Sequence, residues 1–257
     1  MEGTVDRATV VGALTRAGCV AAEEEAEELM AAASDGADLQ HLLDRRLTGE
    51  PLAWITGRTV FCGLDVVVDP GVYVPRWQSE PLARLAADRL PATGVGVDLA
   101  TGSGAVAMVM QATRPHARVV ATELDPVAVR CARRNGVDVL TGHLDRPLPD
   151  QLVGSVDVLC GVLPYVPNDA LRFLPRDVLA FEPRVALDGG ADGLDAVGEV
   201  VRESGRWVRP GGWLALEVGG DQVPAVTSLF EASDYVLVDA LVDEDGDRRA
   251  VVGRRST

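Results

Sequence analysis

The sequence predicts an α/β protein with a doubly wound, mainly parallel sheet, preceded by a small helical domain. Three observations support this. From residue 95 onward, short β-branched runs alternate with helical segments. The first 48 residues contain only helical periodicity. A glycine-rich turn, Gly102–Gly104, follows the first buried run, where such sheets bind ligands. The length of 257 residues suits one large domain with an appendage.

Residues 1–48 are expected to form helices, since Val10, Val11 and Leu14 repeat at helical spacing. Further helices are expected over 23–33 and 38–47. The segment holds ten acidic residues and four arginines, so it is either a solvated surface or a docking surface for a basic partner.

Residues 49–70 are expected to form a β-hairpin linker, because β-branched residues flank Gly63 and 69–71 is a turn sequence. The remaining 71–257 form the expected catalytic domain. Its expected strands are 95–99, 118–122, 137–140, 156–160 and 213–218. Helices are expected from Ser103 and over 125–135, 194–208 and 221–232. A closing pair, 235–241 and 250–252, is expected to be an antiparallel hairpin because a short charged link joins it.

Composition excludes several functions. The formal charge is −15, and all 24 basic residues are arginine. A chain this acidic offers no basic surface for nucleic acid, and without lysine it cannot form a Schiff base or use a P-loop lysine. Four cysteines and three histidines lack metal-ligand spacing, so we expect no metal and reduced thiols. With no apolar run or signal peptide, we expect a cytoplasmic protein that does not contact membranes.

The chemistry is expected at Val95–Ala107. Gly102 and Gly104 allow close backbone approach, and Glu123, at the end of the next strand, can accept ribose hydroxyls. Asp98 would repel a pyrophosphate but attract an amino group. S-adenosylmethionine (SAM) has such a group and no phosphate, so SAM is the expected cofactor rather than a dinucleotide.

Asp98-Leu-Ala-Thr-Gly-Ser-Gly-Ala105 resembles motif I of class I SAM-dependent methyltransferases, with Ala100 where glycine is commonest. The chain as a whole is similar to the HemK/PrmC-type protein-glutamine N5-methyltransferases, within a PrmC-related branch of unknown substrate. That resemblance implies a Rossmann-like, seven-stranded sheet. The matching blocks are Gly49-Glu-Pro-Leu-Ala-Trp-Ile-Thr-Gly57, Asp69-Pro-Gly-Val-Tyr-Val-Pro-Arg-Trp-Gln-Ser-Glu80, Phe181-Glu-Pro-Arg-Val-Ala-Leu-Asp-Gly-Gly-Ala-Asp-Gly-Leu-Asp195 and Arg209-Pro-Gly-Gly-Trp-Leu214.

The resemblance also implies the cofactor contacts. The methionine end of SAM would lie against the motif I turn, the ribose on Glu123, and the segment 75–79 over one side. His143 stands where the family usually has an acid for the adenine amino group, so it either accepts from adenine or caps its loop. The expected cofactor-binding residues are Arg76, Ser79, Asp98, Ala100, Thr101, Gly102, Gly104, Glu123, Leu124, His143, Leu144 and Gly161.

The acceptor motif departs from the family. Where the family signature reads Asn-Pro-Pro-Tyr, this chain has Val162 and Leu163 in place of the first two residues and keeps Pro164 and Tyr165; these four are the residues expected at the reaction centre. Valine cannot bind a carboxamide, and losing one orienting hydrogen bond costs on the order of 10²–10³ in rate. We therefore expect no methyl transfer to a Gly-Gly-Gln peptide and partial recovery on restoring Asn and Pro.

Three functions remain open. In the favoured one, the chain methylates a different nitrogen or oxygen nucleophile, on a small or specialised metabolite. The carbonyls of Gly161 and Leu163, the Tyr165 ring and acids such as Glu182 would orient it. In the second, it methylates a protein glutamine through backbone contacts. In the third, it binds SAM without turnover. Trp77 either walls the acceptor pocket or packs at the domain junction. Glu217 and Asp221, which flank Gly219-Gly220, either face the same cleft or, as we favour, lie in a solvated loop. The oligomeric state is not predicted.

Overall fold

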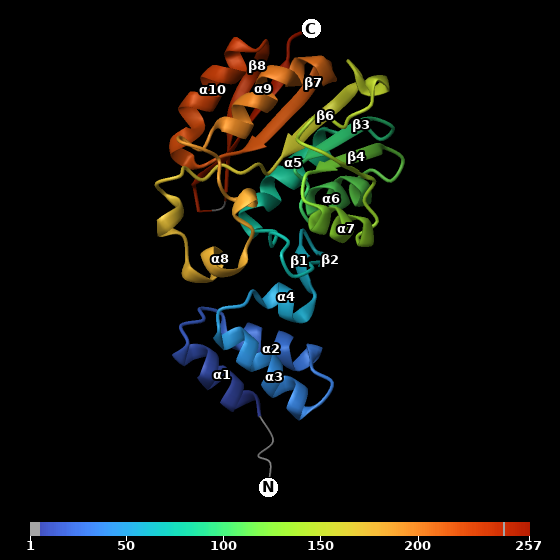
Figure 1. Ribbon diagram of the computed structural model, residues 1–257. Coiled ribbons are helices and arrows are strands. Elements are labelled where there is room, and N and C mark those ends of the chain that lie inside the picture. Colours follow the sequence, from blue (N-terminus) through green and yellow to red (C-terminus); the bar gives the residue numbers. More distant parts are fainter. Residues whose placement is uncertain (1–5, 244) are drawn as a thin grey trace.

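The computed structural model describes residues 6–243 and 245–257 and consists of a helical bundle joined to an α/β domain (Figure 1). The bundle contains α1 (Arg7–Arg16), α2 (Ala22–Ala32) and α3 (Gly36–Leu47). Their apolar faces meet in a separate small core built around Leu14, Leu29 and Leu43. Asp6 and Asp35 cap the first and third helices by accepting backbone N–H groups.

The short helix α4 (Leu52–Thr56) connects the two parts and contributes to both of their cores. Ile55 packs with the bundle, whereas Trp54, one residue earlier, packs with the core of the α/β domain. The Trp54 indole donates to the Val72 carbonyl at 2.9 Å, and its ring meets Phe181 edge-on at 6.2 Å. The chain then forms the antiparallel hairpin of β1 (Arg58–Phe61) and β2 (Leu64–Val67).

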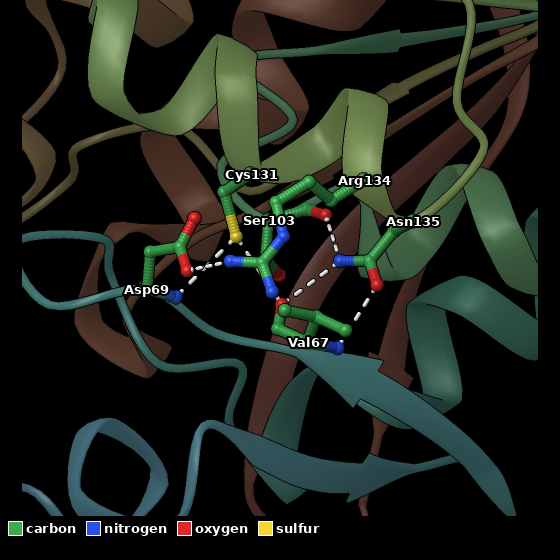
Figure 2. A network of polar contacts seen from close by, with 6 residues as sticks. All are labelled: Val67, Asp69, Ser103, Cys131, Arg134 and Asn135. Atoms are coloured by element: carbon green, nitrogen blue, oxygen red, sulfur yellow. Dashed lines mark hydrogen bonds and ion pairs between the residues drawn. The ribbon is translucent and has the colours of Figure 1, made fainter.

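The hairpin is fastened to the α/β domain by a polar network at the end of α7 (Pro126–Arg134), drawn in Figure 2. The Asn135 amide accepts from the Val67 N–H at 2.9 Å and donates to the carbonyls of Val67 and Ser103, both at 2.8 Å. Cys131 and Arg134 contact Asp69 alongside it. Because Ser103 belongs to the glycine-rich turn, the Asn135 side chain holds both the hairpin and this turn.

The α/β domain is built on a seven-stranded sheet in the order β5-β4-β3-β6-β7-β9-β8, which confirms the predicted class. The first five are parallel, and β9 lies antiparallel between β7 and β8. Chain order reverses between β3 and β6, which makes a crevice at their carboxyl ends. The strands are β3 (Val95–Leu99), β4 (Arg118–Glu123), β5 (Val139–Thr141), β6 (Val156–Gly161), β7 (Val208–Glu217), β8 (Tyr235–Val242) and β9 (Arg248–Arg255).

Helices cover both faces of the sheet (Figure 1). On one face α5 (Glu80–Arg89), α6 (Ala105–Thr113) and α7 enclose the larger core, and on the other α9 (Asp195–Trp207) and α10 (Val223–Ala232) enclose the second. The short α8 (Arg176–Phe181) lies between the sheet and the bundle. No helix among the described residues is long and apolar enough to cross a membrane.

The prediction missed several helices and placed the start of one strand wrongly. The helices α4, α5 and α8 were not predicted, and β7 begins at Val208 rather than Trp213. The strand runs through Pro210 and the two glycines that follow, because its register shifts beside Val156–Val158 and accommodates them as an irregularity.

Candidate cofactor and acceptor site

A cavity of about 940 Å³ opens at the carboxyl ends of β3, β4, β6 and β7. Its walls come from the motif I turn, from 71–79, and from the long segment 162–189 that follows β6. The reversal of strand order between β3 and β6 therefore leads directly into this cavity. All the predicted site residues line this cavity except Gly104 and Gly161, which lie immediately beside it in the chain.

The turn after β3 has a backbone that only small residues tolerate. Ala100, Gly102 and Gly104 have φ values of 52°, 58° and 90°, in the left-handed region. At Gly104 a Cβ atom would lie 2.7 Å from Val137 Cγ2, so glycine is required by both conformation and space. Ala100 adopts the same region without that freedom, at a cost of about 1–2 kcal/mol for a residue with a Cβ.

Asp98 is the buried acid of this turn, with 1% of its surface exposed. Its Oδ2 accepts from the Thr101 hydroxyl and from the Ala107 N–H at 3.2 Å. Burial raises the pKa of Asp98 to about 7, against the effect of these two bonds. A cationic amino group beside it would favour the ionised form, so the turn suits the methionine end of SAM.

Glu123 joins the end of β4 to the same turn. Its carboxylate accepts from the N–H groups of Gly102 at 2.9 Å, Leu124 at 2.7 Å and Asp125 at 2.8 Å. A carboxylate has about four acceptor positions, so one remains on Oε2 for a ribose hydroxyl. Burial raises the pKa of Glu123, while the backbone bonds oppose that effect.

The loop after β5, the strand next to β4, places His143 on the cavity wall. His143 Nε2 lies 3.1 Å from Glu199 Oε2 on α9, and Arg146 donates to the other oxygen of Glu199 at 3.1 Å. The pKa of Glu199 is lowered by these neighbours, His143 first. The nearby Asp145 points into the core instead and accepts from the Trp207 indole at 2.7 Å.

The segment 75–79 closes one side of the cavity. Arg76 pairs with Glu182, which is 6% exposed, and its guanidinium lies 5.0 Å from the Tyr73 ring centre. Ser79 is buried and also lines the cavity. Trp77, for which the sequence suggested a pocket wall or a packed position, is 54% exposed and lies outside the cavity lining that the structure describes.

At the acceptor end, the main chain after β6 is held from several directions. Gln222 donates to the Tyr165 carbonyl at 2.9 Å, and Val166 exchanges backbone bonds with Leu187 and Gly189. A Cβ atom on Gly193 would lie 2.2 Å from the Tyr165 carbonyl oxygen. The glycines of 189–193 therefore allow this loop to pass directly against the Pro164–Tyr165 backbone.

One prediction at this end was wrong. Glu217 was expected in a solvated loop, but β7 continues through it and leaves it 2% exposed on the cavity wall. The Tyr165 hydroxyl donates to its Oε1 at 3.1 Å. Asp221 is exposed, as expected. Sequence reasoning also missed Tyr73, Gln222 and Arg249, whose proximity depends on tertiary packing. The run of apolar residues leading into Glu217 was the one signal that could have revealed it.

The described residues contain no cluster of three His, Cys, Asp or Glu side chains able to hold a metal ion. The cavity lining has two parts, which we name after the roles predicted for their residues: the cofactor end, around Asp98, Glu123 and the motif I turn, and the acceptor end, around Val162–Tyr165 and Glu217.

The known proteins to which this chain is similar are named methyltransferases. The family model for the methyltransferase small domain matches residues 63–141. The chain is 37% identical over 219 residues to the release factor glutamine methyltransferase of Geobacter sulfurreducens, covering 83% of this chain and 76% of that protein. It is 40% identical over 216 residues to the enzyme of the same name from Moorella thermoacetica, covering 80% and 75%.

Among solved structures, a methyltransferase from Pyrococcus furiosus aligns with a TM-score of 0.52 and 19% identity. The alignment covers 76% of this chain and 91% of that one. Identity this low supports the shared fold only.

Proposed function

The chain belongs to the release factor glutamine methyltransferases, a HemK/PrmC-type family of SAM-dependent methyltransferases, and on that premise we propose that it methylates the side-chain amide nitrogen of a glutamine in a release factor. The observation that carries the proposal is similarity to enzymes of that name over four fifths of the chain, acceptor segment included. It replaces the different nucleophile that Val162 led us to favour, which these comparisons do not support.

The residues of the cofactor end fit SAM. Asp98 supplies a buried anion for the amino group, and Glu123 keeps an acceptor position for the ribose. With Nε2 of His143 bonded to Glu199, its Nδ1 is left to accept from the adenine amino group. Bound SAM supplies an electrophilic methyl group on a sulfonium. The protein orients the acceptor for in-line attack and excludes water.

The acceptor end supports an amide held by main-chain groups. Restraint of Tyr165 and Val166 by Gln222, Leu187 and Gly189 fixes the backbone at the cavity mouth. Pre-organised backbone groups of this kind lose little entropy on binding. A carbonyl in this segment can therefore accept from the acceptor N–H in place of the missing asparagine.

We also assign protein recognition to the helical bundle, 1–48, with 49–70 as its connection to the catalytic part. Several acids of α2 are engaged within the bundle: Glu25 pairs with Arg46, and Glu23 and Glu27 pair with Arg7. The remaining acids, including the exposed Glu24, leave the surface negative and suited to a basic partner face.

The test is transfer of labelled methyl from SAM to a bacterial release factor, with mass spectrometry to locate the product. We expect a single modified glutamine, and no label on a factor in which Asn replaces that glutamine. Val162→Asn combined with Leu163→Pro should raise kcat about 10-fold, since one orienting hydrogen bond is worth on the order of 10²–10³ and a new side chain recovers only part of it.

Absence of transfer from the wild-type protein, with SAM binding intact by calorimetry, would overturn the proposal. A different nitrogen or oxygen nucleophile would then become the leading candidate, because Val162 has neither a donor nor an acceptor. If SAM itself does not bind, both the glutamine methyltransferase function and transfer to a different nucleophile are excluded.

A further inference from the structure

The residue beside Val162 on the neighbouring strand is a buried carboxylate. In the parallel pair β6–β7, Gly161 is in register with Leu216, so the next positions are Val162 and Glu217. Alternation along a strand places Glu217 on the same face as Ala215 and Val162 on the same face as Cys160. Ala215, Cys160 and Val162 all belong to the larger core. The Glu217 side chain therefore stands about 5 Å across the sheet from the position that lost its amide.

The carboxylate of Glu217 is only half satisfied. Oε1 accepts from the Tyr165 hydroxyl at 3.1 Å. Oε2 is buried and accepts no hydrogen bond of normal geometry from the described residues; the Ser79 hydroxyl, which lies beside the carboxylate and acts on its pKa, likewise makes none. A buried polar atom without a partner costs about 1–3 kcal/mol, so its persistence in a cavity wall calls for a ligand that satisfies it.

The cations near Glu217 are engaged by other carboxylates. Arg249, the cation that acts on it, is engaged by Asp243 at 2.6 Å and by Asp247 at 2.9 Å. Arg76 is paired with Glu182. The other groups facing Glu217 are the hydroxyls of Tyr165 and Ser79, and burial raises the pKa of the acid despite them. No cation is thus dedicated to Glu217 within the described site.

We propose that Glu217 is a catalytic residue whose Oε2 accepts a hydrogen bond from the N–H of the acceptor amide and then its proton. The inference rests on the proposed function and names the group that replaces the asparagine. The amide nitrogen bonds to the methyl carbon as the carbon–sulfur bond breaks, and that electron pair stays on sulfur. The surplus proton on nitrogen passes to Oε2, leaving a neutral N-methyl amide and S-adenosylhomocysteine.

Three variants test this on the full chain with release factor as acceptor. Glu217→Gln retains an acceptor oxygen but cannot take the proton, so we expect kcat to fall about 100-fold with KM within about 3-fold of wild type. Glu217→Leu loses both functions and should also raise KM. Glu203→Gln, which removes an exposed acid on α9, is the matched control and should keep wild-type kinetics.

Affinity for S-adenosylhomocysteine and the Tm should remain near wild type in both Glu217 variants, which shows that the fold and the cofactor end are intact. Wild-type kcat in Glu217→Gln and Glu217→Leu would overturn the inference, whereas absence of transfer by the wild-type protein would count against the proposed function.

A second measurement needs no acceptor. A SAM analogue with a protonated amine in place of the methyl-bearing sulfonium projects a cation toward the acceptor end. We expect wild type to bind it at least 10-fold more tightly than S-adenosylhomocysteine, and Glu217→Gln to reduce that ratio about 10-fold, since a hydrogen bond to a charged group is worth about 1.5–3 kcal/mol. An unchanged ratio in Glu217→Gln would overturn the inference even if glutamine is methylated.

Discussion

The two ends of the cavity bind by different means. The cofactor end relies on the strained backbone around Gly102 and on two acids, Asp98 and Glu123, which are fixed by local N–H and O–H donors. The acceptor end has an apolar Val162 where an amide is expected and a single buried acid, Glu217, on the adjacent strand. The comparison shows that the residues we assign to the cofactor come from one strand–turn–helix unit and the end of the next strand along the chain, while those we assign to the acceptor meet only through contacts between β6 and β7.

Among the changes that test this contrast, substitution of Asp98 is expected to have the largest effect on binding. Asp98→Asn should weaken SAM binding about 10- to 100-fold by calorimetry, because it removes a charge-assisted bond worth about 1.5–3 kcal/mol. Since the pKa of Asp98 is raised to about 7, affinity of the wild type for SAM should fall as the pH drops below 7 and the acid is protonated. The variant should lose that pH dependence.

The same acid should reduce stability in the absence of SAM. A carboxyl with a raised folded-state pKa binds its proton more tightly when folded, so its contribution declines as pH rises from about 4 to about 7. Ligand-free Asp98→Asn should therefore have a higher Tm than wild type at pH 8, with the difference vanishing near pH 4. Equal Tm values at pH 8 would contradict the raised pKa.

A smaller effect on cofactor binding is expected at His143, and it would show whether the cofactor end extends to this residue. His143→Leu should weaken S-adenosylhomocysteine binding about 5-fold, the value of one hydrogen bond of about 1 kcal/mol. An analogue of S-adenosylhomocysteine with a carbonyl in place of the adenine amino group should bind the wild type more weakly than S-adenosylhomocysteine does. His143→Leu should bind the two ligands equally well. Arg146→Gln, which leaves the His143 ring in place, is the control. Discrimination retained by His143→Leu would place the adenine elsewhere.

The smallest effect is expected at Ala100. Ala100→Gly relieves a left-handed conformation and should raise the free energy of unfolding by about 0.5–1 kcal/mol, or Tm by about 1–4 °C. The same change at Ala112, an exposed position of α6, should destabilise by about 1 kcal/mol. A loss of stability in Ala100→Gly would mean that the methyl group packs favourably enough to outweigh the strain.

The sequence predicted that Asp98, Gly102 and Glu123 lie together because these residues are close in the chain: Asp98, Gly102 and Gly104 lie within seven residues, and Glu123 ends the next strand. It also predicted that Val162–Tyr165 line the same cavity. It did not predict the contact of Glu217 with Tyr165, because 52 residues of chain separate the two and the pairing of β6 with β7 brings them together. The glycines after Glu217 resembled a loop, while α5 lacked a periodic signal strong enough to distinguish it.

The helix α4 sets the geometry between the two parts of the protein. Adjacent residues, Trp54 and Ile55, are buried in different hydrophobic cores, and the hairpin that follows is fastened through Asn135. The bundle is thus fixed to the catalytic part rather than tethered to it. On the proposed function, a protein bound to the bundle would have to present its reactive side chain at one set distance from its docking surface. The shape of the acceptor protein would then decide whether its side chain reaches the cavity.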